Sequence, residues 1–150
     1  MGDNVLSQVS AGWDEAMGFK YLQLSRDEVV IEFVVGEIHR QAYGIVHGGV
    51  HCGAIEAVCS AGAGMDAMTR GQTVVGVENH TSFVRAARAG RVEVRATPIT
   101  RGRRMQLWEA TARDAGGRVI ATGRVRLMCL EPGAELAGEP VAVTPRREGR

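Results

Sequence analysis

The 150-residue chain contains no apolar run long enough to cross a membrane, and its N-terminus lacks a basic stretch followed by an apolar one. We therefore expect a cytoplasmic protein that has no membrane partner. The formal net charge of +1 provides no overall field that would recruit nucleic acid. The three cysteines include no Cys-x-x-Cys motif and are odd in number, so we expect reduced thiols rather than disulfides.

Turn signals and alternating apolar residues predict one long helix between strands. The helix is expected from residue 48 to about residue 68, before Gly71. The expected strands cover 19–24, 28–35, 72–84, 90–100, 104–114 and 118–130. Such a chain forms an α+β domain, with the helix packed on one face of a mostly antiparallel sheet of five to six strands. We assign residues 1–130 to a single domain and residues 131–150, which hold three of the four prolines, to a loose C-terminal tail.

The predicted helix contains an unusual number of small residues. They are Gly53, Ala54, Ala57, Ala61, Gly62, Ala63 and Gly64. Glycine is a weak helix former, so its use inside a helix needs a reason. Small side chains allow another part of the chain to approach the helix backbone closely, and a curved sheet that wraps tightly around a central helix would require such an approach.

The most informative stretch runs from Gln41 to Glu56 and contains His47-Gly48-Gly49 at the predicted start of the helix. A free backbone N–H at a helix N-terminus is a donor directed at negative charge. A carboxylate within an otherwise apolar helix is costly unless it has a task or a partner. An oxyanion donor together with a carboxylate indicates acyl chemistry. The alternative is a tight turn at Gly48 and Gly49 and an ordinary paired helical acid at Glu56.

The spacing between Gly48 and Glu56 has a consequence for assembly. The two residues are eight positions apart, which is about 12 Å along a helix axis. An oxyanion donor and a base must each lie about 3 Å from the same reacting group, so these two can cooperate only if they come from two chains. A two-fold axis with roughly antiparallel helices would bring Gly48 of one subunit near Glu56 of the other. The catalytic interpretation therefore predicts at least a homodimer.

These residues resemble the hotdog-fold acyl-CoA thioesterases over about residues 13–130. The similarity rests on Gln41, Gly44-Ile-Val-His47-Gly48-Gly49, Cys52, Glu56, Val75-Gly76-Val77, Asn79-His80-Thr81-Ser82-Phe83, Arg85 and Arg101-Gly102-Arg103-Arg104. It is greatest to the branch that contains the Arthrobacter-type 4-hydroxybenzoyl-CoA thioesterase, with phenylacetate-pathway and menaquinone-pathway dihydroxynaphthoyl-CoA thioesterases as near neighbours. The resemblance implies a long central helix wrapped by a curved sheet, a homotetramer built from two dimers, and the release of a carboxylic acid and free CoA.

The resemblance also implies a role for each matching residue. Gly48 corresponds to the residue whose N–H polarises the thioester carbonyl, and Glu56 to the catalytic carboxylate, acting as nucleophile or as general base for water. Gln41 corresponds to a side chain that holds the carbonyl or the water, His47 to a histidine that shapes the turn, and Ser60 to a hydroxyl that orients water or the acid. A thioester carbonyl is already electrophilic and its thiolate leaves without protonation. One donor and one carboxylate can then suffice, with no metal and no cofactor beyond the CoA of the substrate.

Four arginines are candidates for contacts with the phosphates of CoA, because a guanidinium suits bidentate phosphate binding. They are Arg85, Arg101, Arg103 and Arg104. A solvated turn is the alternative for each of them. Two departures from the family pattern concern other positions: His51 stands where relatives often have an aromatic or apolar residue, and Ala61 replaces a charged residue that the Arthrobacter-type enzyme has on the acyl side. The resemblance therefore does not identify the acyl group.

Two other interpretations remain open. His47 and His51 are spaced i, i+4 with Cys52 and Glu56 nearby, which permits a metal site, but the chain has no His-Glu-x-x-His motif and we expect no metal. The second interpretation is a non-catalytic acyl-CoA-binding or regulatory hotdog domain. The retention of Glu56 favours the enzyme, because binding alone does not need a buried acid.

Overall fold

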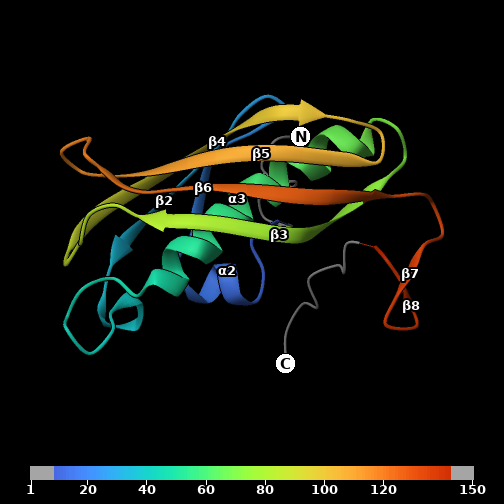
Figure 1. The fold of residues 1–150 in the computed structure, drawn as a ribbon. Helices are drawn as coiled ribbons and strands as arrows, with labels where there is room; N and C mark the ends of the chain where they lie inside the picture. The colour runs from blue at the N-terminus through green and yellow to red at the C-terminus, as the bar shows by residue number, and fades with distance from the viewer. Residues whose placement is uncertain (1–8, 143–150) are drawn as a thin grey trace.

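The helix α3 (Gly48–Met68) lies along one face of a six-stranded sheet (Figure 1). The strand order is β1-β2-β4-β5-β6-β3, and neighbouring strands are antiparallel. The strands are β1 (Lys20–Leu24), β2 (Val29–Val35), β3 (Thr73–Phe83), β4 (Gly90–Arg101), β5 (Met105–Asp114) and β6 (Val119–Leu130). This computed structural model describes residues 9–142, and its architecture confirms the predicted α+β fold with one long central helix. Within residues 9–142, no helix is long and apolar enough to span a membrane.

Several short elements lie outside the predicted ones. The helix α2 (Trp13–Ala16) and the 3-10 helix η1 (Glu37–His39) precede α3. A hairpin of β7 (Glu135–Leu136) and β8 (Glu139–Pro140) follows the sheet, inside the stretch expected to be a loose tail. Residues 143–150 of that stretch lie outside the described residues, so the domain boundary at residue 130 and the looseness of the tail stay predictions.

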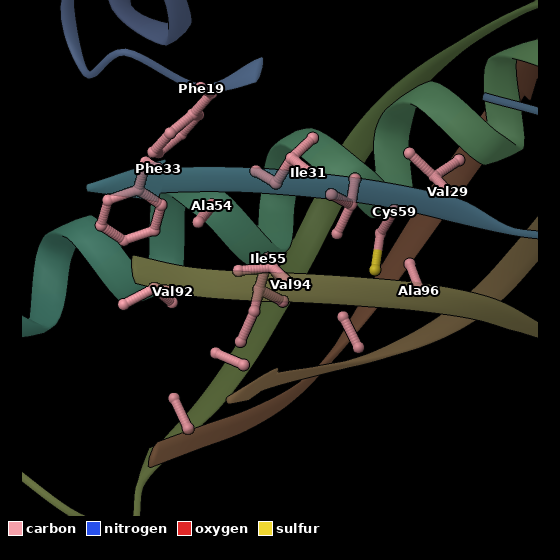
Figure 2. Packing of buried hydrophobic residues seen from close by; sticks show 14 of the residues in the cluster. Phe19, Val29, Ile31, Phe33, Ala54, Ile55, Cys59, Val92, Val94 and Ala96 are labelled. Atoms are coloured by element: carbon pink, nitrogen blue, oxygen red, sulfur yellow. The ribbon is translucent and has the colours of Figure 1, made fainter. Parts of the chain in front are cut away.

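The face of the sheet that meets α3 carries alternating buried side chains, as expected for strands covered on one face. In β4 these are Val92, Val94 and Ala96, each of which is fully buried. Figure 2 shows them across from Ile55 and Cys59 of α3, with side chains of β2 beside them. Full burial of a valine side chain is worth about 1.5–3 kcal/mol relative to an exposed position. The core that fixes the position of α3 therefore lies between the helix and the sheet.

Glycines in α3 allow aromatic rings to contact the helix backbone. Trp108 of β5 is fully buried, and a Cβ atom on Gly62 would lie 2.5 Å from its ring. A Cβ atom on Gly53 would lie 2.2 Å from the ring of Trp13 in α2. Contacts of this length are sterically forbidden, so any larger residue at Gly62 would push the sheet away from the helix. This confirms for Gly62 the expected reason for small residues in the helix.

The strand β3 forms one edge of the sheet and pairs, among the described strands, with β6 alone. It is 11 residues long, and none of its residues is fully buried. A long exposed edge strand presents unpaired backbone N–H and C=O groups that can pair with another chain. Because β3 also packs against α3, this edge of the sheet borders the residues described next.

Candidate active site

Two other side chains hold the carboxylate of Glu56, which lies in the third turn of α3. One helical turn further on, Ser60 Oγ donates to Oε1 at 3.2 Å. From β3, Asn79 Nδ2 donates to Oε2 at 2.9 Å and to the carbonyl oxygen of Cys52 at 3.1 Å. Thr81 Oγ1 in turn donates to Asn79 Oδ1 at 2.7 Å, which orients the amide. The carboxylate is therefore held in one orientation from the helix and from the edge strand.

The contributions of Asn79 and Gly76 were not predicted from the sequence, although both residues belong to the stretches that carry the family resemblance. A Cβ atom on Gly76 would lie 2.2 Å from Glu56 Oε1, so the glycine leaves the space that the carboxylate occupies. The pairing of β3 with β6 shifts register between Gly76 and Glu78. Such a shift reverses which residues face the helix. Simple alternation along β3 therefore could not place Asn79 beside Glu56.

A groove of about 550 Å³ opens beside Glu56; we call it the Glu56 groove. Its walls are mostly apolar and include Trp13, Ala57, Ala61, Met65, Met68 and Val74. Besides Glu56 and Ser60, two further polar side chains line it, those of Asp14 and Tyr21. Burial raises the pKa of Asp14 from 3.8 to about 6, and the hydroxyl of Tyr21 is buried without a hydrogen-bond partner in the described part of the chain. The groove has the size and the apolar surface to hold a small organic group next to the carboxylate.

The N-terminus of α3 is capped by His47, the residue predicted to shape this turn. Its Nδ1 accepts a hydrogen bond from the N–H of Gly49 at 2.8 Å, and its carbonyl oxygen accepts one from the N–H of Val50 at 2.9 Å. No acceptor for the Gly48 N–H is found among residues 9–142. The first backbone donor of the helix therefore remains available to a negatively charged or carbonyl oxygen.

A second pocket, of about 290 Å³, lies at this end of the helix; we call it the Gly48 pocket. Gln41, Gly48, His51, Phe83 and Arg85 contribute to its wall. A Cβ atom on Gly48 would lie 2.6 Å from the ring of Phe83, so the ring lies directly over the glycine. The structure thus brings Gly48 together with the predicted Gln41 and Arg85, and it adds His51 and Phe83.

Gln41 is positioned by the loop between η1 and α3. Its backbone N–H donates to the carbonyl oxygen of Ile45 at 2.9 Å, and its side-chain Oε1 accepts from the N–H of Tyr43. Its carbonyl oxygen accepts from the N–H of Gly44, which has the positive φ of 74° that favours glycine. The amide oxygen of Gln41 is therefore used inside the loop, and its NH₂ group is the part left for a ligand.

The Glu56 groove and the Gly48 pocket have no wall residue in common among the described residues. Glu56 and Ser60 belong to the first, and Gly48 and Gln41 to the second. Their separation along one helix agrees with the distance of about 12 Å expected from helix geometry. One chain therefore holds two halves of the predicted site and does not join them.

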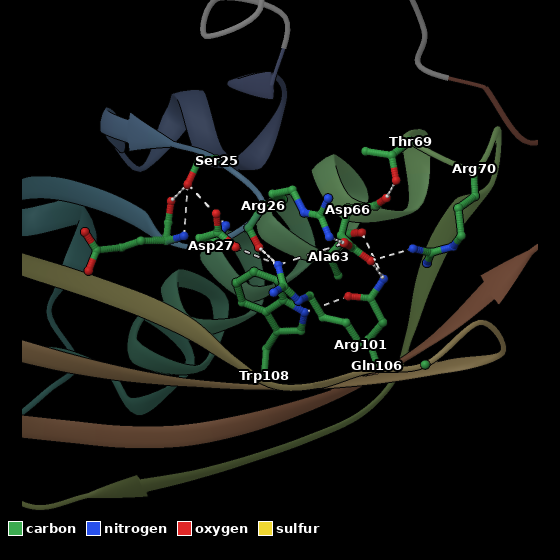
Figure 3. A network of polar contacts seen from close by, with 12 residues as sticks. Ser25, Arg26, Asp27, Ala63, Asp66, Thr69, Arg70, Arg101, Gln106 and Trp108 are labelled. Carbon is green, nitrogen blue, oxygen red and sulfur yellow. Dashed lines mark hydrogen bonds and ion pairs between the residues drawn. The ribbon is translucent and has the colours of Figure 1, made fainter.

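One of the four candidate arginines, Arg101, takes part in a polar network inside the chain (Figure 3). The carboxylate of Asp66, fully buried in α3, lies 2.9 Å from Arg26 and 2.8 Å from Arg70. The guanidinium of Arg101 lies 3.9 Å from Asp66 and 2.7 Å from Asp27. A phosphate bound by Arg101 would have to compete with these carboxylates.

Arg103 and Arg104 lie in the turn between β4 and β5, near the C-terminal end of α3. The carbonyl oxygen of Arg103 accepts from Gln72 Nε2, just after α3, at 3.2 Å, and its exposed guanidinium lies 3.7 Å from Glu131. Arg85 lies at the opposite end of this 21-residue helix, about 30 Å away along its axis. One chain therefore does not bring the four arginines together, and their binding of CoA phosphates stays a prediction.

Three of the four residues weighed as metal ligands, all except Cys52, have other surroundings. His47 caps the helix, and Glu56 binds Ser60 and Asn79. Burial lowers the pKa of His51, whose side chain lies in the wall of the Gly48 pocket. In the described part of the chain, no group of three or more His, Cys, Asp or Glu side chains could hold a metal ion.

Comparisons with known proteins identify the family of this chain. Residues 43–121 match the Thioesterase superfamily. A Mycobacterium tuberculosis protein that carries the provisional name of an esterase is 41% identical over 125 residues, which cover 82% of this chain and 89% of that protein. Its structure has a TM-score of 0.78 to this chain at 40% identity, with coverage of 83% of this chain and 98% of that chain.

Two further similarities are to proteins named as thioesterases. The proofreading thioesterase EntH of Cronobacter turicensis is 33% identical over 111 residues, which cover 74% of this chain and 80% of that protein. The crystal structure of a thioesterase from Haemophilus influenzae has a TM-score of 0.80 at 26% identity and covers 86% of this chain and 90% of that chain. The shared architecture is thus found in proteins named for thioester cleavage.

Proposed function

Because this chain belongs to the thioesterase superfamily and is a thioester hydrolase of the hotdog fold, we propose that it hydrolyses an aromatic or other acyl-CoA to the free acid and CoA. Within the family, the sequence around Gly48 and Glu56 supports assigning the chain to the branch of 4-hydroxybenzoyl-CoA and phenylacetate-pathway thioesterases. The reaction needs no cofactor beyond the CoA of the substrate. The proposal includes a cytoplasmic location.

The proposed reaction uses the free N–H of Gly48 and the carboxylate of Glu56. The thioester carbonyl oxygen accepts a hydrogen bond from Gly48 N–H, which polarises the carbonyl carbon. Glu56 either removes a proton from an attacking water or attacks the carbon itself, and both routes pass through a tetrahedral intermediate. When the C–S bond breaks, the carbonyl re-forms and CoA leaves as the thiolate. The general-base route then gives the free acid directly, whereas the nucleophilic route gives an anhydride between Glu56 and the acyl group, which water hydrolyses to the free acid and the regenerated carboxylate. Ser60 and Asn79 hold the carboxylate in the orientation that either route requires.

The single observation that carries the proposal is the division of these groups between two pockets of one chain. Among residues 9–142, neither pocket alone brings together the Gly48 N–H and the Glu56 carboxylate. A two-fold axis places the Gly48 pocket of one subunit against the Glu56 groove of the other and completes two equivalent sites. The exposed edge of β3, which carries Asn79 and packs beside Glu56, is the natural surface for this dimer. We expect two such dimers to form a homotetramer.

In this arrangement the acyl group occupies the Glu56 groove. Its mostly apolar walls favour an aromatic or short aliphatic acyl group over a charged one. The CoA portion of the bound substrate extends from the site past the Gly48 pocket, where Arg85 lies in the wall. Arg103 and Arg104 can reach the same CoA only from another subunit, because they lie at the far end of α3.

The proposal is tested by steady-state kinetics with aryl-, phenylacetyl- and straight-chain acyl-CoAs. Substitution Glu56→Gln keeps the shape of the side chain and removes its charge and basicity. We expect kcat to fall at least about a hundredfold with little change in KM. The variant must retain the oligomeric state and the melting temperature of the wild type. Near-normal turnover by such a well-folded variant would contradict the carboxylate mechanism.

A further inference from the structure

His51 lies three residues after Gly48 in α3, so the two residues share one face of the helix. Side chains in a helix tilt toward its N-terminus, which directs His51 back toward the free Gly48 N–H. Both residues contribute to the wall of the Gly48 pocket. The His51 ring also packs against Phe83, with ring centroids 6.1 Å apart. The imidazole therefore stands beside the backbone donor of the proposed site.

Packing alone does not account for a histidine at this position. The residue is only 4% exposed, and its Nδ1 is buried without a hydrogen-bond partner among residues 9–142. A buried polar atom without a partner is destabilising, whereas an apolar side chain would fill the space without that cost. Burial also lowers the pKa of His51, so the ring is neutral at neutral pH. A neutral, partly unsatisfied imidazole next to a binding pocket suggests that its other nitrogen has a task.

The burial of Nδ1 determines which nitrogen carries the hydrogen. A neutral imidazole has one N–H and one acceptor nitrogen. A hydrogen on Nδ1 would be a buried donor without an acceptor, which proteins avoid more strictly than an unpaired acceptor. The hydrogen is therefore placed on Nε2, and Nε2–H is the donor that the ring offers.

We propose that the Nε2–H group of His51 is a second hydrogen-bond donor, beside the Gly48 N–H, to the carbonyl oxygen of the thioester. The inference rests on the proposed thioester hydrolysis at this site. When water or Glu56 attacks the carbonyl carbon, the π electrons move to the oxygen, and the two N–H groups share the negative charge. When the C–S bond breaks, the carbonyl re-forms and the thiolate leaves. His51 donates a hydrogen bond throughout and transfers no proton.

Three substitutions in the full-length chain test this role. His51→Phe and His51→Leu both remove the donor and replace the ring with an apolar side chain. Because the two side chains differ in shape, a loss of activity in both is not explained by the misfit of one of them. Both variants should lower kcat by about ten- to a hundredfold and leave KM within about threefold. The reason is that the hydrogen bond from His51 to the carbonyl oxygen strengthens as negative charge develops on that oxygen in the transition state. His51→Gln places an amide N–H near the position of Nε2 and should keep kcat within about fivefold of the wild type. The matched control Val50→Ala disturbs the core in the same helical turn and should lower the melting temperature with kcat unchanged.

Two readouts do not depend on turnover. At least one of the two apolar variants should melt at or above the temperature of the wild type, because it removes an unpaired buried nitrogen. Nitrogen-15 NMR of the histidines in the wild-type chain should show His51 neutral and protonated on Nε2 at pH 7. A proton on Nδ1 would overturn the proposal.

The kinetic outcomes separate this inference from the proposed function. A wild type that cleaves no acyl-CoA contradicts the proposed function and removes the basis of the inference. A wild type that cleaves acyl-CoA, with apolar variants as fast as the wild type, overturns the role of His51 alone. A Gln variant as slow as the apolar variants, or one that loses an acidic limb in its kcat–pH profile, would show that His51 transfers a proton and would also overturn the donor role.

Discussion

A Cβ atom on Gly76 would lie 2.2 Å from Oε1 of Glu56. The edge strand and the helix can hold the carboxylate between them only because this position of β3 has no side chain. The same carboxylate accepts hydrogen bonds from Ser60 on one side and from Asn79 on the other. The space left by Gly76 and these two donors together determine where the negative charge lies.

The first prediction concerns this glycine. Gly76→Ala should displace the Glu56 carboxylate and lower kcat by about ten- to a hundredfold, because a small misplacement of a reacting group is costly. The φ of Gly76 is not positive, so alanine is compatible with the backbone there. Gly36→Ala is the matched control, since its Cβ atom would meet only an ordinary contact at 3.8 Å. Equal kcat values for the two variants would argue against a positional role of Gly76.

The second prediction uses the titration of Asp14. Its pKa is raised by burial from 3.8 to about 6, so the folded chain holds this proton more tightly than the unfolded chain. The contribution of Asp14 to the free energy of unfolding therefore falls as the pH rises from about 4 to about 6. Asp14→Asn should be more stable than the wild type above pH 6, and the difference should vanish below about pH 4.

Chemical denaturation at several pH values measures this difference. Glu37→Gln, at an exposed position, serves as the control for the loss of a negative charge. A stability gain in Asp14→Asn that is constant from pH 4 to pH 8 would exclude titration of Asp14 as its cause.

The third prediction separates two of the candidate arginines. Arg85→Ala should raise KM for acyl-CoA about three- to tenfold and leave KM for a truncated thioester without the nucleotide unchanged, because only CoA has the phosphates. The effect should shrink at high salt, since exposed phosphate contacts are screened. Equal KM shifts for the full and the truncated substrate would exclude phosphate binding by Arg85.

Arg101→Ala should behave differently. It removes the partner of Asp27 and one of three cations around the buried Asp66, so we expect a loss of about 1 kcal/mol in the free energy of unfolding. Thermal or urea denaturation of Arg101→Ala beside Arg85→Ala measures this contrast. A variant as stable as the wild type but with a raised KM would favour phosphate binding by Arg101 instead.

The sequence was most informative where a local signal decides the structure. The start of α3 at Gly48 was predictable because His47 and the glycine pair mark the change from loop to helix. The end near Met68 was predictable because Gly71 follows it. The strands agree with the predicted ranges to within one residue at each end. By contrast, α2 has only four residues and therefore no periodicity that could reveal it.

The candidate site was predictable only in part. The link between Ser60 and Glu56 follows from their i, i+4 spacing on a helix. The contact of Asn79 with Glu56 depends on a register shift in β3, and the pairing of Arg101 with Asp27 joins residues 74 positions apart. Neither depends on a local pattern. The unpaired nitrogen of His51 likewise becomes visible only when burial is known.

The central claim is that each active site combines Gly48 of one chain with Glu56 of another, and mixing two inactive variants tests it most directly. Glu56→Gln removes the carboxylate. Gly48→Pro removes the N–H, and the backbone accepts the substitution because proline is tolerated at the first helical position and His47 already has the extended conformation that precedes a proline. A Cβ atom at position 48 would lie 2.6 Å from the ring of Phe83, so this ring must shift, and the Gly48→Pro variant serves the test only if it keeps the oligomeric state of the wild type.

Each variant alone should be inactive, and a mixture refolded from equal amounts should regain about a quarter of the wild-type activity. Half of the dimers formed at random are mixed, and each mixed dimer has one of its two sites intact. If Gly48 and Glu56 acted within one chain, no mixed dimer would contain an intact site. Absence of any recovered activity, with mixed dimers demonstrated by mass spectrometry, would contradict the shared site.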